Sequence, residues 1–218
     1  NGVRINSTSF STDSQTIAYG TKEGITFVAI HTTESKSLLI PSWENTKRIT
    51  DYKVCFSPDG KKKIAARNRT ISVWEVGSNK QIASLQSNLE MISGKIEVSP
   101  DGRFLAVSVI KYATSTSSPE NRGAIELWDI QTNKSLGVFP YDSQINMLAF
   151  SPNSRYLAIG GNKDIVEMID ISSARKTRLK GTHPSSFIPF LAFSIDGKTL
   201  YTGGGHALKI WNLKEQLD

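Results

Sequence analysis

The sequence has few of the residues that build disulfide frameworks, metal sites or membrane spans. Its 218 residues include one cysteine, Cys55, and three histidines, His31, His183 and His206. A single cysteine excludes an internal disulfide and favours a reducing compartment, so we expect a cytoplasmic protein. No apolar run approaches the roughly 18 residues that a membrane-spanning helix needs.

The motifs that mark common catalytic and metal sites are also missing from the sequence. It has no His-Glu-x-x-His, paired Cys-x-x-Cys, calcium-binding loop, Gly-x-Ser-x-Gly elbow or phosphate-binding Gly-rich loop. The Gly203-Gly204-Gly205-His206 stretch is interpreted as a tight turn. A Ser-His-Asp site could still assemble from distant residues, but nothing in the sequence nominates one. We therefore expect no enzyme activity, no cofactor and no metal.

The charge and composition indicate a globular chain with a basic surface. Hydrophobic residues make up 38% and charged residues 21%, and the net charge is +6. The positive charge is spread along the chain, so it permits acidic partners without implying nucleic acid. The Lys61-Lys62-Lys63 run is expected to be the solvated shoulder of a hairpin.

One phrase recurs five times and is the main signal in the sequence. Its starts are 46, 42, 52 and 43 residues apart. The copies begin at Phe10, Phe56, Val98, Phe150 and Phe193. A polar insertion, Lys111 to Gly123, accounts for the long third interval. Periods of 20 to 50 residues are typical of solenoids and propellers.

Each repeat is predicted to form four short antiparallel strands. An apolar run ends in Phe-Ser or Val-Ser, and Pro-Asp-Gly or a variant follows, which favours a tight turn. A second apolar run and a third, alternating run follow, such as Ile125 to Ile130. A further turn leads to a short fourth strand, such as Lys134 to Phe139. An ordinary β-sandwich is the alternative fold, but it would not repeat one phrase five times in phase.

These phrases resemble the WD-repeat family over essentially the whole chain. Trp128-Asp129 matches the dipeptide of the family, and Trp74-Glu75 and Trp211-Asn212 are near matches. The resemblance implies an all-β fold, a β-propeller of four-stranded antiparallel blades. The five units are predicted at residues 3–40, 47–86, 91–139, 144–180 and 187–213.

The resemblance also implies a structural hydrogen-bond network of His, Ser/Thr, Trp and Asp in each blade. Only the fifth unit keeps a recognisable part of it, as His183, Thr202 and Trp211. We interpret His183 as a residue that holds the blade together and not as a ligand or a base. The other blades should depend mainly on apolar packing.

The five units leave the predicted ring incomplete. The fifth unit ends just after its third strand, so it lacks an outer strand. Most members of the family have about seven blades, which predicts that the chain is the C-terminal portion of a longer one. The alternatives are a compact five-bladed ring and an arc closed by a partner.

By the same resemblance, partners are expected on the face formed by two sets of connections. These join the fourth strand of a blade to the first strand of the next, and the second strand to the third. Aromatic and arginine side chains carry much of the energy of interfaces. The candidate partner-binding residues are Trp43, Lys47, Arg48, Arg67, Arg69, Tyr112, Arg122, Tyr141, Lys163, Phe187 and His206.

Two functions remain open at this point. The favoured one is a non-enzymatic scaffold or sensing module that binds protein partners and is attached to an upstream effector domain. The alternative is a module that binds nucleic acid through the basic loop face. The insertion at Lys111 to Gly123 lies on the same face, and we expect it to take part in recognition.

Overall fold

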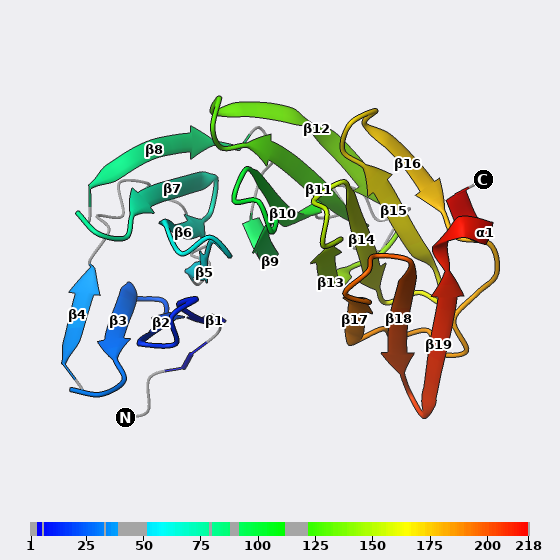
Figure 1. Ribbon diagram of the computed structural model, residues 1–218, viewed down its shortest axis with the longest axis horizontal. Helices are drawn as coiled ribbons and strands as arrows, with labels where there is room; N and C mark the ends of the chain where they lie inside the picture. Colours follow the sequence, from blue (N-terminus) through cyan, green and yellow to red (C-terminus); the bar gives the residue numbers. More distant parts are fainter. Residues whose placement is uncertain are drawn as a thin grey trace.

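The protein folds into five antiparallel β-sheets that follow one another along an open arc (Figure 1). This computed structural model describes residues 4–5, 7–32, 34–38, 52–78, 80–87, 92–111 and 122–217. Strands that are consecutive in the sequence are neighbours in their sheet. We call the sheets blades 1 to 5. The prediction of an all-β fold built from propeller blades is confirmed.

The strands of the five blades have the following bounds. Blade 1 consists of β1 (Ser7–Phe10), β2 (Thr16–Gly20), β3 (Ile25–Ala29) and β4 (Ser35–Leu38). Blade 2 consists of β5 (Lys53–Phe56), β6 (Lys62–Arg67), β7 (Thr70–Glu75) and β8 (Gln81–Gln86). Blade 3 consists of β9 (Ile92–Val98), β10 (Phe104–Lys111), β11 (Arg122–Asp129) and β12 (Lys134–Tyr141). Blade 4 consists of β13 (Ile145–Phe150), β14 (Tyr156–Gly161), β15 (Val166–Asp170) and β16 (Arg175–Arg178). Blade 5 consists of β17 (Phe190–Phe193), β18 (Thr199–Gly204) and β19 (Ala207–Asn212).

The first strand of each blade lies on the concave side of the arc and the last strand on the convex side (Figure 1). Blade 5 has three strands, which confirms the prediction that its outer strand is missing. The short helix α1 (Leu213–Leu217) follows β19 directly. In the described part of the chain, no helix is long and apolar enough to cross a membrane.

The core lies between successive blades, because each sheet buries its side chains against the next sheet. One cluster joins blade 2 to blade 3 and includes Ile71, Val73 and Leu105. A second joins blades 3 and 4, and a third joins blades 4 and 5 around Met168 and Trp211. Most of the chain's stability should therefore come from these flat apolar interfaces.

The arc is open, because blades 1 and 5 lie apart at its two ends (Figure 1). Of the alternatives weighed from the sequence, the compact five-bladed ring is therefore not the arrangement observed. The other two alternatives, a longer ring and an arc closed by a partner, are both compatible with the open arc of these five blades.

The recurring phrase forms the same hydrogen-bonded turn between the first and second strand of every blade. In blade 3, Ser99 Oγ donates to Asp101 Oδ1 at 2.5 Å, and the backbone N–H of Arg103 donates to the same oxygen at 3.0 Å. The Ser99 hydroxyl also accepts the N–H of Phe104 at 2.8 Å. The equivalent bonds occur in the other four blades. The side chains of the serine and of the acid or amide thus accept hydrogen bonds from backbone N–H groups that would otherwise lack a partner in a tight turn.

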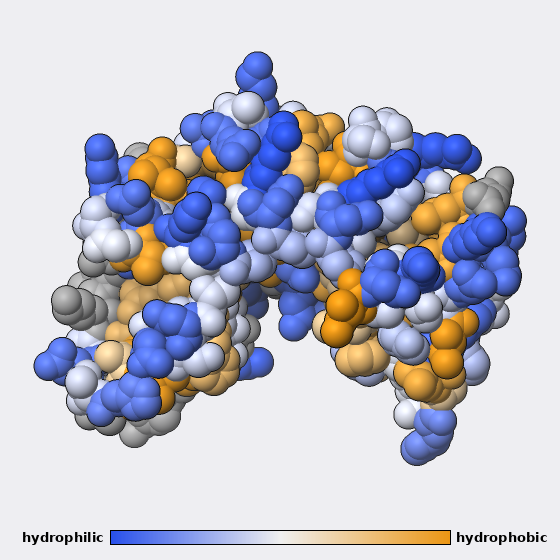
Figure 2. All heavy atoms as spheres, in the orientation of Figure 1, coloured by the Kyte–Doolittle hydropathy of each residue, from blue (hydrophilic) through white to orange (hydrophobic). Residues whose placement is uncertain are grey.

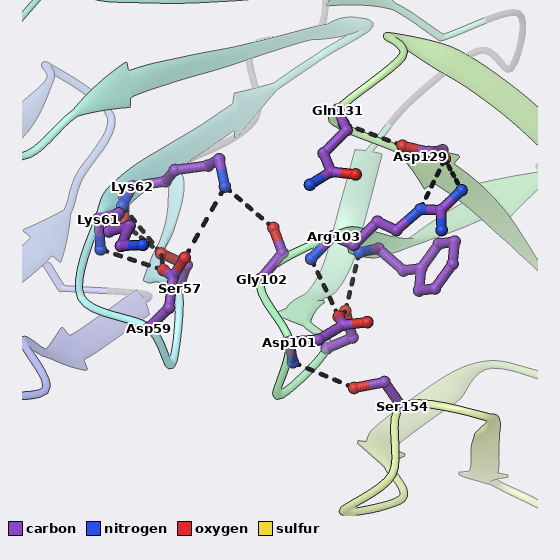
Figure 3. A network of polar contacts seen from close by, with 12 residues as sticks. Ser57, Asp59, Lys61, Lys62, Asp101, Gly102, Arg103, Asp129, Gln131 and Ser154 are labelled. Atoms are coloured by element: carbon purple, nitrogen blue, oxygen red, sulfur yellow. Dashed lines mark hydrogen bonds and ion pairs between the residues drawn. The ribbon is translucent and has the colours of Figure 1, made fainter.

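These turns also contact one another along the arc (Figure 3). The Lys62 ammonium in blade 2 donates to the carbonyl of Gly102 in blade 3 at 3.1 Å. The N–H of Asp101 donates to the hydroxyl of Ser154 in blade 4 at 3.1 Å. The turns therefore tie neighbouring blades together at one end of the sheets.

The lysine run at 61–63 differs from the prediction that it forms a solvated shoulder. Only Lys61 is exposed. Lys62 reaches blade 3, and the buried Lys63 places its ammonium 4.4 Å from the ring centre of Phe27 in blade 1. Two of the three lysines therefore connect blade 2 to its neighbours, and the solvated interpretation was wrong for them.

Candidate binding surface

The connections between the second and third strands lie at the opposite end of the sheets from the turns described above. The connections between consecutive blades lie at that same end, because all the sheets share one strand order. We call this side of the arc the loop surface. The described part of it carries the predicted residues Arg67, Arg69, Lys163, Phe187 and His206.

Two arginines flank the turn between β6 and β7 in blade 2. Asn68 at the centre of the turn has a φ of 52°, which asparagine adopts more readily than most residues. The guanidinium carbon of Arg67 lies 4.5 Å from the centre of the Tyr52 ring. Arg69 remains exposed, and its Nε donates to the carbonyl of Ser87 at 3.0 Å. Both side chains are thus positioned by contacts within the fold.

Phe187 is presented by the loop that enters blade 5, and 51% of its surface is exposed. The Ser185 hydroxyl donates to the Phe187 carbonyl at 3.0 Å and accepts the Phe187 N–H at 3.2 Å. A Cβ at Gly204 would lie 2.0 Å from the Phe187 carbonyl oxygen, so the loop packs directly on the backbone of β18. The exposed His206 and Gly205, which has a φ of 61°, form the adjacent turn.

The three residues expected to hold blade 5 together are joined by hydrogen bonds. Trp211 Nε1 donates to the hydroxyl of Thr202 at 2.8 Å. One ring nitrogen of His183 lies 3.2 Å from the Thr202 carbonyl, and the other lies 3.0 Å from the N–H of Ser185. All three residues are buried. His183 therefore connects the entering loop to β18.

The tryptophans of the other blades lack this arrangement. Trp74 and Trp128 are buried, and Trp128 Nε1 has no hydrogen-bond partner in the described part of the chain. Asp129 follows Trp128 and accepts two hydrogen bonds from Arg103, at 2.9 and 2.8 Å (Figure 3). Asp129 thus stabilises the end of the blade that carries the turn between its first and second strands.

Three predicted residues of blades 3 and 4 are placed differently from one another. Tyr141 is only 3% exposed, and its hydroxyl donates to the carbonyl of Ile165 at 2.9 Å. It therefore holds the connection between β14 and β15 and offers little surface to a partner. Lys163 lies in that connection, and Arg122 begins β11 opposite Lys111. Trp43, Lys47, Arg48, Tyr112 and most of the insertion lie outside the described residues.

The concave side of the arc holds a hollow of about 700 Å³ that the sequence did not suggest. The innermost strands β1, β5, β9 and β13 line it with residues that include Cys55, Lys95, Glu97 and Asn146. Burial raises the pKa of Glu97 to about 7, although Lys95 and a hydrogen bond from the Phe150 backbone oppose the shift. Burial also raises the pKa of the Cys55 thiol, which makes it a poor nucleophile. Among the described residues, no three His, Cys, Asp or Glu side chains are grouped as a metal site would require.

Comparisons with known proteins agree with the repeats seen in the fold. The family model described as "WD domain, G-beta repeat" matches residues 175–212, which run from β16 to the end of β19. Small ribosomal subunit protein RACK1 of Drosophila melanogaster is 28% identical over 180 residues, or 75% of this chain and 52% of RACK1. Protein groucho of the same organism is 28% identical over 162 residues, or 74% of this chain and 19% of groucho. The chain thus spans about half of one relative and about a fifth of the other.

A solved structure with a similar fold is hydrazine synthase of Kuenenia stuttgartiensis, with a TM-score of 0.70. The match covers 97% of this chain and 65% of that one, at 17% sequence identity. This likeness shows the propeller fold alone. The five repeated turns and blades agree with the match of residues 175–212 to the WD-domain model, and the chain is similar to WD-repeat proteins.

Proposed function

We propose that this protein is a non-enzymatic platform that binds protein partners through its loop surface. The observation that carries the proposal is the presentation of Phe187. The Phe187 residue is half exposed, while its backbone is fixed by Ser185 and packed on Gly204. An apolar group on a preorganised backbone loses little conformational entropy when a partner covers it.

Arg69 on blade 2 supports the same interpretation. Its Nε contact with Ser87 restricts the side chain, yet the residue remains exposed. Arginine and aromatic side chains are enriched among the residues that dominate protein interfaces. A partner that contacts both blades 2 and 5 would meet the cation of Arg69 on blade 2 and the apolar ring of Phe187 on blade 5.

The chemistry of the described side chains also favours binding over catalysis. Both ring nitrogens of His183 are engaged within blade 5, and the pKa of Cys55 is raised. The name of RACK1 denotes a protein of the small ribosomal subunit. The single cysteine fits a cytoplasmic location, which we include in the proposal.

A salt titration separates protein partners from nucleic acid. Mixed-sequence single-stranded and duplex oligonucleotides are titrated into the purified protein at several salt concentrations. Proteins captured from the lysate of its host are tested at the same salt concentrations. We expect capture of defined proteins with a shallow dependence on salt. Tight oligonucleotide binding with a steep log–log salt slope would instead indicate phosphate recognition and would refute the protein-binding proposal.

A further inference from the structure

Lys209 lies on β19 in blade 5, and its ammonium is bound within the fold. Hydrophilic side chains cover much of the side of the arc seen in Figure 2, as is usual for charged residues. The Lys209 ammonium instead lies 3.7 Å from the centre of the Trp211 ring and donates to the Thr182 carbonyl at 2.6 Å. The residue is half-buried, and this loss of water lowers its pKa. The ring face and the carbonyl together hold the ammonium in one place.

The carbonyl that Lys209 binds belongs to the loop that presents Phe187. This connection between β16 and β17 comprises residues 179–189, and we call it the Phe187 loop. Gly181 precedes Thr182 with a φ of 90°, and a Cβ there would lie 3.1 Å from Lys209 Nζ. The loop backbone therefore packs directly on the ammonium. Carbonyl groups of a loop have no partner strand, so a side chain or water must supply their hydrogen bonds.

Hydrogen bonds connect Thr182 to Phe187 along the loop. The N–H of His183, the next residue, donates to the carbonyl of Asp164 in blade 4 at 2.7 Å. The N–H of Ser185 donates to a ring nitrogen of His183 at 3.0 Å, and the Ser185 hydroxyl accepts the Phe187 N–H at 3.2 Å. A shift of Thr182 is therefore passed to Phe187 through His183 and Ser185.

The strands β18 and β19 hold the Phe187 loop at two points. Lys209 pairs in register with Thr202, whose carbonyl lies 3.2 Å from the other ring nitrogen of His183. The Thr202 hydroxyl accepts the indole N–H of Trp211, which fixes the ring beneath the Lys209 ammonium. Lys209 and His183 thus anchor successive residues of the loop to the same pair of strands.

Comparison of the repeats shows that a lysine at this position is particular to blade 5. The strand registers place at the equivalent position of blades 1 to 4 the residues Thr26, Ser72, Glu126 and Glu167. None of these four side chains carries a positive charge. The connection into blade 4 is short, residues 142–144, whereas the Phe187 loop spans residues 179–189. The cation therefore occurs in the blade whose longer entering loop it can hold.

We propose that Lys209 is a positioning residue of the binding surface. Its ammonium fixes the Phe187 loop and so sets how strongly partners bind, although Lys209 itself contacts no partner. This inference rests on the proposed function, in which Phe187 is covered by a protein partner. A loop that is ordered before the partner arrives loses less entropy on binding. Without the ammonium, Phe187 keeps its chemistry but its backbone loses one of its anchors.

Hydrogen–deuterium exchange of the amides of residues 181–187 tests the positioning directly. Lys209→Met keeps an apolar stem over Trp211 and removes the ammonium, so we expect exchange at least about tenfold faster in this segment. Lys209→Arg keeps a cation and donors and should restore slow exchange. Lys176→Met is the matched control, because it removes a half-buried ammonium that donates to the Pro140 carbonyl elsewhere on the arc. Thermal unfolding checks that each variant keeps its fold, and Lys209→Gln gives the same comparison if Lys209→Met does not fold.

Partner capture links the order of the loop to binding. The proteins that the wild type retains from host lysate and Phe187→Ala loses are quantified for each lysine variant. We expect at least about a fivefold loss for Lys209→Met, with retention unchanged for Lys209→Arg and Lys176→Met. Slow exchange or full retention in Lys209→Met would overturn the proposal, as would a loss that Lys209→Arg does not restore or that Lys176→Met shares. If Phe187→Ala retains every protein, the proposed function itself fails, and this inference fails with it.

Discussion

Trp128 and Trp211 occupy equivalent places in the third strands of blades 3 and 5, but their indole N–H groups differ. Trp211 pairs in register with Leu200, and Trp128 pairs with Leu105. Trp211 donates to Thr202, whereas Val107 stands at the equivalent position in blade 3 and Trp128 Nε1 has no described partner. The same residue type is therefore hydrogen-bonded in one blade and only packed in the other.

We expect Trp211→Phe to destabilise the protein more than Trp128→Phe, by about 1–3 kcal/mol. Both changes remove a similar volume, but only Trp211→Phe leaves the buried Thr202 hydroxyl without its donor. Chemical denaturation of the two variants gives the comparison. Equal losses of unfolding free energy would show that the hydrogen bond in blade 5 contributes nothing.

Glu126 is a second unusual residue in blade 3. Its exposed fraction is 0%, and neither carboxylate oxygen has a hydrogen-bond partner in the described part of the chain. Replacing it with an apolar side chain of similar size removes an uncompensated polar group. We expect Glu126→Met to raise the unfolding free energy by about 1–3 kcal/mol, measured by denaturation. Glu23→Met, at an exposed turn, should have almost no effect; a destabilised Glu126→Met protein would refute this account.

Glu97 should make stability depend on pH. Its folded pKa of about 7 lies above the ordinary value of 4.5, so the folded chain holds a proton that the unfolded chain has released between these values. The unfolding free energy contributed by this group therefore falls as pH rises from about 4.5 to about 7. Glutamine does not titrate in this range, so the Glu97→Gln variant lacks this pH-dependent loss of unfolding free energy.

We expect wild type and Glu97→Gln to unfold alike near pH 4.5 and the variant to be more stable above pH 7. The difference should reach at most about 3 kcal/mol, since one pKa unit corresponds to about 1.4 kcal/mol. Thermal unfolding of both proteins across this pH range measures it. A constant difference across the range would contradict the assignment to Glu97.

At the scale of single elements, the turn between the first and second strands is the most regular feature. Gly102 has a φ of 70°, and a Cβ there would lie 2.7 Å from the Asp59 carboxylate of the preceding blade. We expect Gly102→Ala to cost about 1–3 kcal/mol of unfolding free energy, because alanine is strained at this φ and displaces Asp59. Gly77→Ala is the control, since nothing lies within 4 Å of a Cβ at that position. Equal effects of the two substitutions in denaturation experiments would argue against contact between the turns.

These turns and the strands around them could be predicted because their causes are local. Ser99, Asp101 and Gly102 form their turn through partners within five residues, so the phrase alone specifies it. The place of Tyr141 could not be predicted in this way. Its hydroxyl partner, Ile165, is 24 residues away, and the sequence carries no local signal of that contact.

The lysine run shows the same limit. A Lys61-Lys62-Lys63 sequence beside a turn normally indicates a solvated hairpin. Lys62 and Lys63 instead reach blades on either side, and those contacts exist only once three repeats are stacked. Contacts between blades therefore set the role of residues that look like surface residues in one repeat.

For the whole molecule, the five repeats predicted five blades, and the end of the fifth repeat after its third strand predicted that this blade lacks an outer strand. The sequence did not predict the hollow on the concave side, which depends on how far the arc curves. The candidate binding residues of the loop surface differ in their exposure, and their role in binding stays a prediction. Phe187, His206 and Arg69 are exposed there, while Tyr141 is buried.

The capture of partners by matched surface variants tests the central claim most directly. Arg69→Ala/Phe187→Ala removes one charge and one exposed apolar group from the loop surface. Lys61→Ala/Ile82→Ala removes the same two kinds of group elsewhere on the arc. Each protein is immobilised at equal density, and the proteins it retains from host lysate are quantified by mass spectrometry. We predict at least about a tenfold loss of specific partners for the loop-surface variant, equal to about 1.4 kcal/mol, with the control unchanged. Equal retention by the wild type and the loop-surface variant would contradict the account.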